Sequence, residues 1–336
     1  MKKIATIIFT LTAIFMLSSC NKKTADAKIK IVTTIFPEYD WVQNILGEKA
    51  GQADLTLLLD KGVDLHSYQP TVQDMAKLSV ADIFIYVGGE SDEWVEDALK
   101  TVKNKHMRVV NLLEVLGDKV KEEEVVEGME GEHHHDDHHE GEEHDADEHH
   151  HDEEEAEYDE HVWLSLKNAR LLCAAITETL CAVDEKNAAT YRANLASYDK
   201  TLAALDSQYA DAVKNAPLKT LVFGDRFPFR YLVDDYGISY YAAFAGCSAE
   251  TEASFKTVAF LAAKVDELAL PAVCKIESGD GKIAGTIIQN SKAKQAKVLT
   301  LNSLQSASSR DLSDGTSYIG IMQENLSVLK EALGTL

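Results

Sequence analysis

The longest run of helical periodicity, residues 186–215, most constrains how this chain can fold. Apolar residues recur through it at helical spacing, at Tyr191, Leu195, Tyr198, Leu202, Leu205, Tyr209 and Val213. A continuous helix here would be about 45 Å long at 1.5 Å per residue. It would end before Pro217, because proline disfavours helical geometry in the residue before it. Most helices of globular domains are far shorter, so we expect a stiff rod that connects two lobes.

Strand and helix patterns alternate on both sides of this rod. Four strands are predicted before it and four after it, at residues 29–34, 55–59, 83–87, 108–112, 220–223, 238–243, 272–276 and 297–301. Runs as apolar as residues 83–87 suit parallel strands that are covered on both faces. The sequence therefore predicts an α/β fold, with two α/β lobes of mostly parallel sheets joined by a long rigid helix. The N-terminal lobe would cover residues 29–185 and the C-terminal lobe residues 216–336.

The N-terminus has the pattern of an export signal. Lysines at positions 2 and 3 precede an apolar run over residues 4–17, which is too short to span a membrane comfortably. The run ends in Leu-Ser-Ser-Cys at residues 17–20, which resembles the lipobox of bacterial lipoproteins. The resemblance implies a signal peptide over residues 1–19, lipidation at Cys20, a tether to residue 28 and anchoring at the outer face of the cytoplasmic membrane. An ordinary secretory signal with an accidental cysteine is the alternative.

The charge of the chain is concentrated in one segment. The whole chain carries −23, of which −20 falls between Asp118 and Glu160. No basic stripe is left to neutralise phosphates, so we expect no nucleic-acid partner. Residues 122–157 are almost all Glu, Asp, His and Gly, and they cannot bury enough apolar surface to fold alone. We predict that they form a disordered insertion.

Nine of the twelve histidines lie in this insertion, at His133, His134, His135, His138, His139, His144, His149, His150 and His151. Histidine tracts of this kind commonly bind metals. A flexible chain loses conformational entropy whenever it wraps an ion, so we predict a low-affinity zinc collector. A solvated acidic loop without a metal role is the alternative. Imidazole ligands suit Zn²⁺ better than Mn²⁺, so zinc is the predicted metal.

Two histidines outside the insertion lie in predicted loops. His66 follows an apolar strand, and His161 directly precedes a helix. Loops at the ends of strands line the ligand crevice in open α/β sheets. Taken singly, each could equally be an ordinary surface or hydrogen-bonded histidine. The third, His106, lies between lysines and a strand and is interpreted in that ordinary way.

Several motifs in order resemble the zinc and manganese solute-binding lipoproteins of ABC importers. They are Gly-x-Asp-x-His-x-Tyr-x-Pro at residues 62–70, Gly-Gly-Glu at residues 88–90 and His-Val-Trp-Leu-Ser at residues 161–165. The resemblance covers nearly the whole chain after residue 28. It implies that His66 and His161 bind the metal in a cleft between two lobes. It also implies a Zn²⁺-capturing monomer that delivers its ion to an ABC transporter permease and is not an enzyme.

The C-terminal half departs from the pattern of the family. Arg226 stands where the resemblance places a third ligand, and arginine cannot bind a cation. Its neighbour Asp225 follows a strand and is the predicted substitute. The fourth position falls on Asn302, and Glu277 after another strand is the alternative oxygen donor. The predicted metal ligands are therefore His66, His161, Asp225 and Glu277.

Other functions and pairings stay open at this point. Manganese could replace zinc, and a zinc-dependent surface enzyme or a metal-buffering adhesin are the more distant alternatives. The chain has no HExxH, Gly-x-Ser-x-Gly or P-loop motif. Cys173 and Cys181 are about 12 Å apart along a predicted helix, beyond the reach of a disulfide. Cys247 and Cys274 could form a disulfide in an oxidising compartment.

Overall fold

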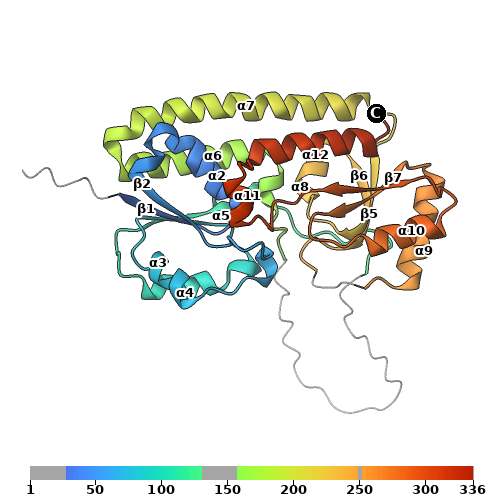
Figure 1. Ribbon diagram of the computed structural model, residues 1–336, viewed down its shortest axis with the longest axis horizontal. Helices are drawn as coiled ribbons and strands as arrows, with labels where there is room; N and C mark the ends of the chain where they lie inside the picture. The colour runs from blue at the N-terminus through green and yellow to red at the C-terminus, as the bar shows by residue number, and fades with distance from the viewer. Residues whose placement is uncertain (1–27, 131–156, 249–251, 336) are drawn as a thin grey trace, which may run out of the picture.

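The structure, a computed structural model, describes residues 28–130, 157–248 and 252–335. Each lobe contains a sheet of four parallel strands (Figure 1). The first sheet has the order β2-β1-β3-β4 and comprises β1 (Ile29–Thr33), β2 (Ala53–Leu57), β3 (Ile83–Tyr86) and β4 (Arg108–Asn111). The second has the order β6-β5-β7-β8 and comprises β5 (Thr220–Arg226), β6 (Ser239–Phe244), β7 (Ala272–Ile276) and β8 (Lys297–Leu301).

Helices cover both sheets. In the N-terminal lobe these are α2 (Phe36–Leu46), α3 (Val72–Leu78), α4 (Trp94–Thr101), α5 (Leu112–Leu116) and α6 (Leu166–Val183). After α7 (Ala188–Asn215), the C-terminal lobe has α8 (Arg230–Tyr236), α9 (Phe255–Glu267), α10 (Lys282–Asn290), α11 (Ser309–Ser313) and α12 (Tyr318–Ala332). The residues Ile83, Phe84 and Ile85 of β3 are fully buried, as expected for a parallel strand covered on both faces.

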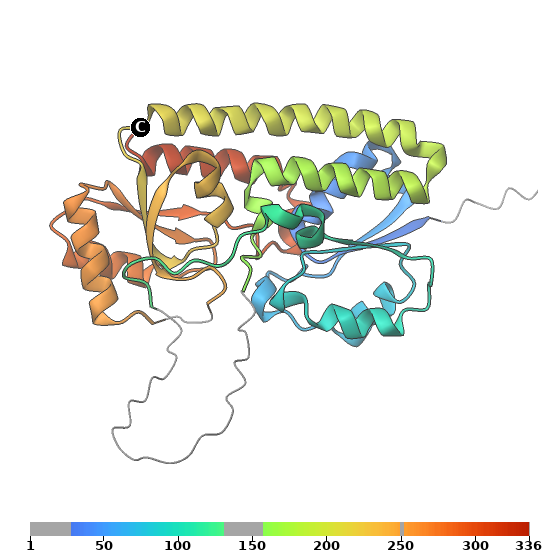
Figure 2. The same cartoon turned by 180° about the vertical axis from the view of Figure 1, so that it is seen from behind.

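The long helix α7 runs along one edge of the molecule and passes over both lobes, with α6 and α12 beneath it (Figures 1 and 2). It begins two residues later than predicted and ends at the predicted residue. Asn194 donates a hydrogen bond to the Ile45 carbonyl at 2.9 Å, which attaches α7 to the N-terminal lobe. Tyr209 donates to the Met322 carbonyl at 2.6 Å, which attaches it to the other lobe. The rod is thus bonded to both lobes.

A tryptophan at the boundary of the lobes joins them further. Trp163 is fully buried, and its indole N–H donates to the Ser303 carbonyl of the C-terminal lobe at 2.8 Å. Tyr318, at the start of α12, donates to the Trp163 carbonyl at 2.7 Å. The segment that carries His161 is therefore fixed at the boundary between the two lobes.

Some details of the structure differ from the sequence-based expectation. The helices α5 and α11 were not predicted, because each has only five residues and shows no full helical period. The predicted disorder begins too early, since residues 122–130 are ordered: Val126 and Met129 pack on the core, and the Glu130 N–H donates to the Ala243 carbonyl at 2.9 Å. The nine insertion histidines and Cys20 lie outside the described residues.

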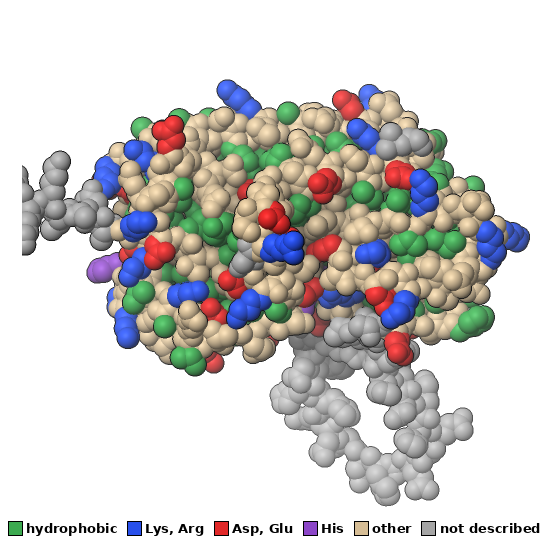
Figure 3. Space-filling model, in the orientation of Figure 1, with side chains coloured by type: hydrophobic (Ala, Val, Ile, Leu, Met, Phe, Trp, Pro, Cys, Tyr) green, Lys and Arg blue, Asp and Glu red, His purple; other side chains and the backbone are tan. Residues whose placement is uncertain are grey.

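The surface carries charges of both signs. Figure 3 shows basic and acidic side chains interspersed on one face, with no continuous basic stripe on that face. Within the described ranges, no helix combines the length and apolar character needed to cross a membrane. Cys247 and Cys274 are both free thiols, so the structure does not contain the disulfide that the sequence left open.

Candidate metal centre

His66 and His161 are each held by a short turn of 3-10 helix. His66 lies within the turn Leu65–Ser67, where its N–H donates to the Asp64 carboxylate at 3.1 Å. His161 directly precedes the turn Val162–Leu164, and its N–H donates to the Asp159 carboxylate at 2.9 Å. An aspartate two residues before each histidine thus fixes its backbone. The turns set the directions in which the two imidazoles point.

The two imidazoles meet at the boundary of the lobes. Their Nε2 atoms are 3.2 Å apart, and their ring centroids are 5.2 Å apart. Two nitrogen ligands of one tetrahedral Zn²⁺, each at about 2.0–2.1 Å from the ion, would be about 3.3 Å apart. The pair is therefore already spaced to share a single ion, with little rearrangement of the side chains.

The outer nitrogen of each ring has a polar partner. His161 Nδ1 lies 2.9 Å from Asp159 Oδ1, in a fully buried position. His66 Nδ1 lies 2.7 Å from the Ser91 hydroxyl and 3.6 Å from the Glu160 carboxylate. Partners of this kind fix the ring orientation and leave Nε2 to the metal. The sequence reading did not single out Asp159, Ser91 or Glu160, although two of these residues directly precede His161.

The two histidines differ in how readily they hold a proton. The pKa of His66 is lowered to about 3, mainly by burial and then by the proximity of His161. Burial also opposes protonation of His161, but Asp159 and Glu160 outweigh it and raise the pKa of His161. In the metal-free protein His66 is therefore a neutral imidazole near neutral pH, and a proton that charges the pair belongs to His161.

The C-terminal lobe presents Arg226 and Gln305 to this pair. Arg226 Nη2 lies 2.7 Å from Asp64 Oδ2, so the arginine at the expected ligand position forms an ion pair with the other lobe. Although burial works against ionisation of Asp64, Arg226 holds the pKa of that carboxyl below its ordinary value. In the amide orientation that satisfies its neighbours, Gln305 donates to Asp64 at 2.8 Å and accepts from His161 Nε2. The sequence reading considered Asn302 in this loop and missed Gln305.

The two predicted carboxylate ligands have other partners in the structure. The Asp225 carboxylate accepts from the N–H groups of Arg226 at 2.9 Å and Ile276 at 3.2 Å. The Glu277 carboxylate accepts from the Ser303 N–H at 2.7 Å and from the Ser306 hydroxyl at 3.0 Å.

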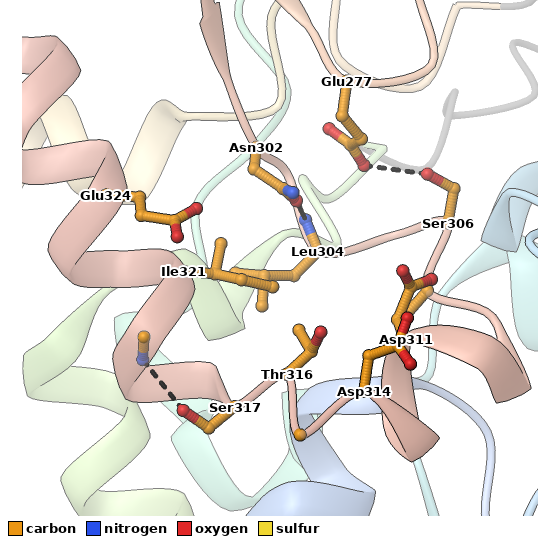
Figure 4. Close-up of a pocket in the computed structure, with 13 residues that line it drawn as sticks. Glu277, Asn302, Leu304, Ser306, Asp311, Asp314, Thr316, Ser317, Ile321 and Glu324 are labelled. Atoms are coloured by element: carbon orange, nitrogen blue, oxygen red, sulfur yellow. Dashed lines mark hydrogen bonds between the residues drawn. The ribbon is translucent and has the colours of Figure 1, made fainter.

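These carboxylates line separate cavities. Asp225 borders one of about 440 Å³, and Glu277 borders one of about 500 Å³, where it points toward Ser306 (Figure 4). Asn302 lines the second cavity and accepts from the Leu304 N–H at 2.8 Å. His66 borders a third cavity, so the structure does not bring the four predicted ligands together.

A cysteine lies beside the two imidazoles. Across the parts of the chain that the structure describes, one group of three possible ligands has one donor atom from each residue within 4.8 Å of the other two: His66, His161 and Cys247. Cys247 follows β6, and its N–H donates to Glu123 at 2.8 Å. Burial, with a contribution from Glu123, raises the pKa of its thiol. No local signal marks Cys247 in the sequence, because it belongs to no CxxC pair and lies 86 residues after His161.

Comparison with known proteins places this geometry in context. The profile of the family described as "Zinc-uptake complex component A periplasmic" matches residues 31–332. Zinc-binding lipoprotein AdcA of Streptococcus pneumoniae serotype 4 is 33% identical over 342 residues, covering 98% of this chain and 61% of that relative. The high-affinity zinc uptake system protein ZnuA of Bacillus subtilis is 30% identical over 334 residues, covering 97% of each chain. The chain thus spans 61% of the length of the first curated relatives that it matches.

Solved structures of similar proteins share the two-lobed fold. The Zn(II)-bound ZnuA-like domain of S. pneumoniae AdcA superposes with a TM-score of 0.67 at 26% identity, covering 91% of this chain and 99% of that chain. The metal-dependent lipoprotein YcdH of B. subtilis gives a TM-score of 0.70 at 27% identity, covering 92% of this chain and 100% of that chain. The predicted fold class is confirmed.

Proposed function

Because the chain belongs to the zinc-uptake complex component A family, we propose that it captures Zn²⁺ outside the cytoplasm and delivers the ion to an ABC transporter permease. The observation that carries this proposal is the pair of imidazoles whose Nε2 atoms are 3.2 Å apart at the boundary of the lobes. That spacing matches two ligands of one tetrahedral zinc ion. Imidazole suits Zn²⁺ better than Mn²⁺, so zinc is the proposed cargo.

Zinc capture depends on the protonation states of His66 and His161. His66 is neutral near pH 7 and can bind the ion at once. His161 gives up the proton on Nε2 when the ion arrives, while Asp159 keeps its hold on Nδ1. His66 comes from the N-terminal lobe, whereas Gln305 comes from the C-terminal lobe. A change in the separation of the lobes would therefore alter the site and allow release.

The remaining predictions extend this role. Lipidation at Cys20 would hold the protein at the outer face of the cytoplasmic membrane. Residues 131–156 would collect zinc weakly and raise its local concentration. Asp225 and Glu277 were the oxygen ligands predicted from the sequence, and each would have to exchange its present hydrogen bonds to reach the ion. We propose a binding role rather than a catalytic one, since members of the family are components of zinc-uptake complexes.

The test is a zinc competition titration against a chelator strong enough to mask weak loop sites. His66→Ala and His161→Ala should each weaken the tight site by about two orders of magnitude or more, because a coordinate bond is lost. His106→Ala is the matched control, since this histidine is exposed and does not belong to the group of possible ligands. Tight one-to-one binding that survives in both ligand variants would contradict the proposal.

A further inference from the structure

We propose that the Cys247 thiolate is the third protein ligand of the core zinc site. The inference rests on the proposed zinc-capturing function and concerns which atoms hold the ion. The C-terminal lobe lacks a metal ligand at the position where the family places one. Arg226 cannot ligate a cation, and its guanidinium is paired with Asp64. The lobe must therefore supply its donor from another segment.

The distances favour Cys247 as that donor. Its sulfur lies within 4.8 Å of one ring nitrogen of His66 and one ring nitrogen of His161. On a tetrahedral zinc with bonds of about 2.3 Å to sulfur and 2.0–2.1 Å to nitrogen, the sulfur would lie about 3.6 Å from each nitrogen. The Asp225 and Glu277 carboxylates do not belong to this group.

The loop that carries Cys247 is packed closely against His161. A Cβ atom on Gly246 would lie 3.1 Å from His161 Cε1 and 3.0 Å from the Phe227 carbonyl, so glycine permits the close approach. Glu123, from the ordered segment before the insertion, accepts the Cys247 N–H at 2.8 Å and fixes the backbone from the other side. These two contacts hold the thiol beside the two imidazoles.

The chemistry of the donor set follows. Coordination replaces the S–H bond of Cys247 with a sulfur–zinc bond, and the thiol proton leaves to solvent. Two neutral imidazoles and one thiolate form a soft donor set, which favours Zn²⁺ over Mn²⁺ more strongly than carboxylates would. The site would therefore still prefer Zn²⁺ to Mn²⁺, although Arg226 occupies the position of the expected third ligand.

Zinc X-ray absorption on the full chain tests this directly. All samples carry Cys20→Ser, so that the four described cysteines are the only thiols, and are loaded with less than one equivalent of zinc. We expect one sulfur at about 2.3 Å together with nitrogen or oxygen at about 2.0–2.1 Å. Cys247→Ser should remove the sulfur signal and weaken zinc binding about a hundredfold or more. Cys181→Ser is the matched control, and it should keep both.

Two outcomes separate this inference from the function on which it rests. Tight zinc binding without a sulfur signal would overturn the role of Cys247 and leave zinc capture standing. Absence of any tight zinc site would contradict the function itself. A second measurement needs no substitution at the site: bound zinc should slow alkylation of Cys247 at least tenfold, and equal rates with and without zinc would overturn the inference.

Discussion

Replacement of Asp159 by asparagine should weaken zinc binding without removing a ligand. The Asp159 carboxylate accepts from both the N–H and the Nδ1–H of His161 at 2.9 Å, and it is 2% exposed. It therefore both orients the imidazole and compensates the charge that the ring gains. Loss of such an outer partner typically costs 10- to 100-fold in metal affinity. That corresponds to about 1.4–2.7 kcal/mol.

The same substitution should change the pH dependence of binding. In the wild type, Asp159 is the main group that raises the pKa of His161 against the effect of burial. Without the carboxylate, burial dominates and the pKa of His161 falls below its ordinary value of about 6.5. The zinc affinity of the variant should thus decline less between about pH 8 and about pH 6, because fewer molecules hold a competing proton.

Chelator competition at several pH values measures both effects. Asp199→Asn is a suitable control, because Asp199 pairs with Arg170 at 2.6 Å on the faces of α7 and α6. It removes one negative charge without touching either histidine. The contradicting result is that Asp159→Asn binds zinc as tightly as Asp199→Asn does, with the pH profile of the wild type. That result would show that Asp159 neither orients His161 nor raises its pKa.

Four further predictions follow from the same geometry. In the wild type, zinc affinity should fall about a hundredfold per pH unit below the raised pKa of His161, since His161 and the Cys247 thiol each give up a proton; a flat profile in competition titrations would contradict this. Deleting residues 131–156 should remove several weak zinc equivalents in equilibrium dialysis and retain the tight one, and loss of the tight one would place the loop in the core site. Gly246→Ala should weaken zinc binding although every donor remains, because its Cβ would press on His161; unchanged affinity would show that the loop can move freely. Trp163→Ala should lower the free energy of unfolding by about 3–5 kcal/mol in urea titrations, and a loss below 1 kcal/mol would show that Trp163 does not join the lobes.

Long-range periodicity made the architecture predictable. The apolar stripe over residues 186–215 marked α7, because a helix that contacts both lobes must keep one face apolar throughout its length. The fully apolar run at residues 83–87 marked a parallel strand that is covered on both faces. Helices as short as α5 and α11 left no such stripe, so the sequence could not reveal them.

The metal centre was predictable only where a donor lies in a local motif. His66 and His161 each lie in a recognisable loop, and the structure brings their Nε2 atoms together. Gln305 lies in the late loop that the sequence located, but the turn decides which side chain faces inward. Gln305 reaches His161, whereas the Asn302 side chain accepts from the N–H of Leu304, whose φ is 60°. Cys247 comes from a distant strand end, and only the folded chain places it at the site.

Anomalous diffraction at the zinc edge, from crystals of the full chain loaded with one equivalent of zinc, tests the central claim most directly. We predict one dominant peak at the boundary of the lobes, about 2.0–2.1 Å from the Nε2 atoms of both His66 and His161. A dominant peak that contacts neither imidazole, or only one of them, would contradict the account.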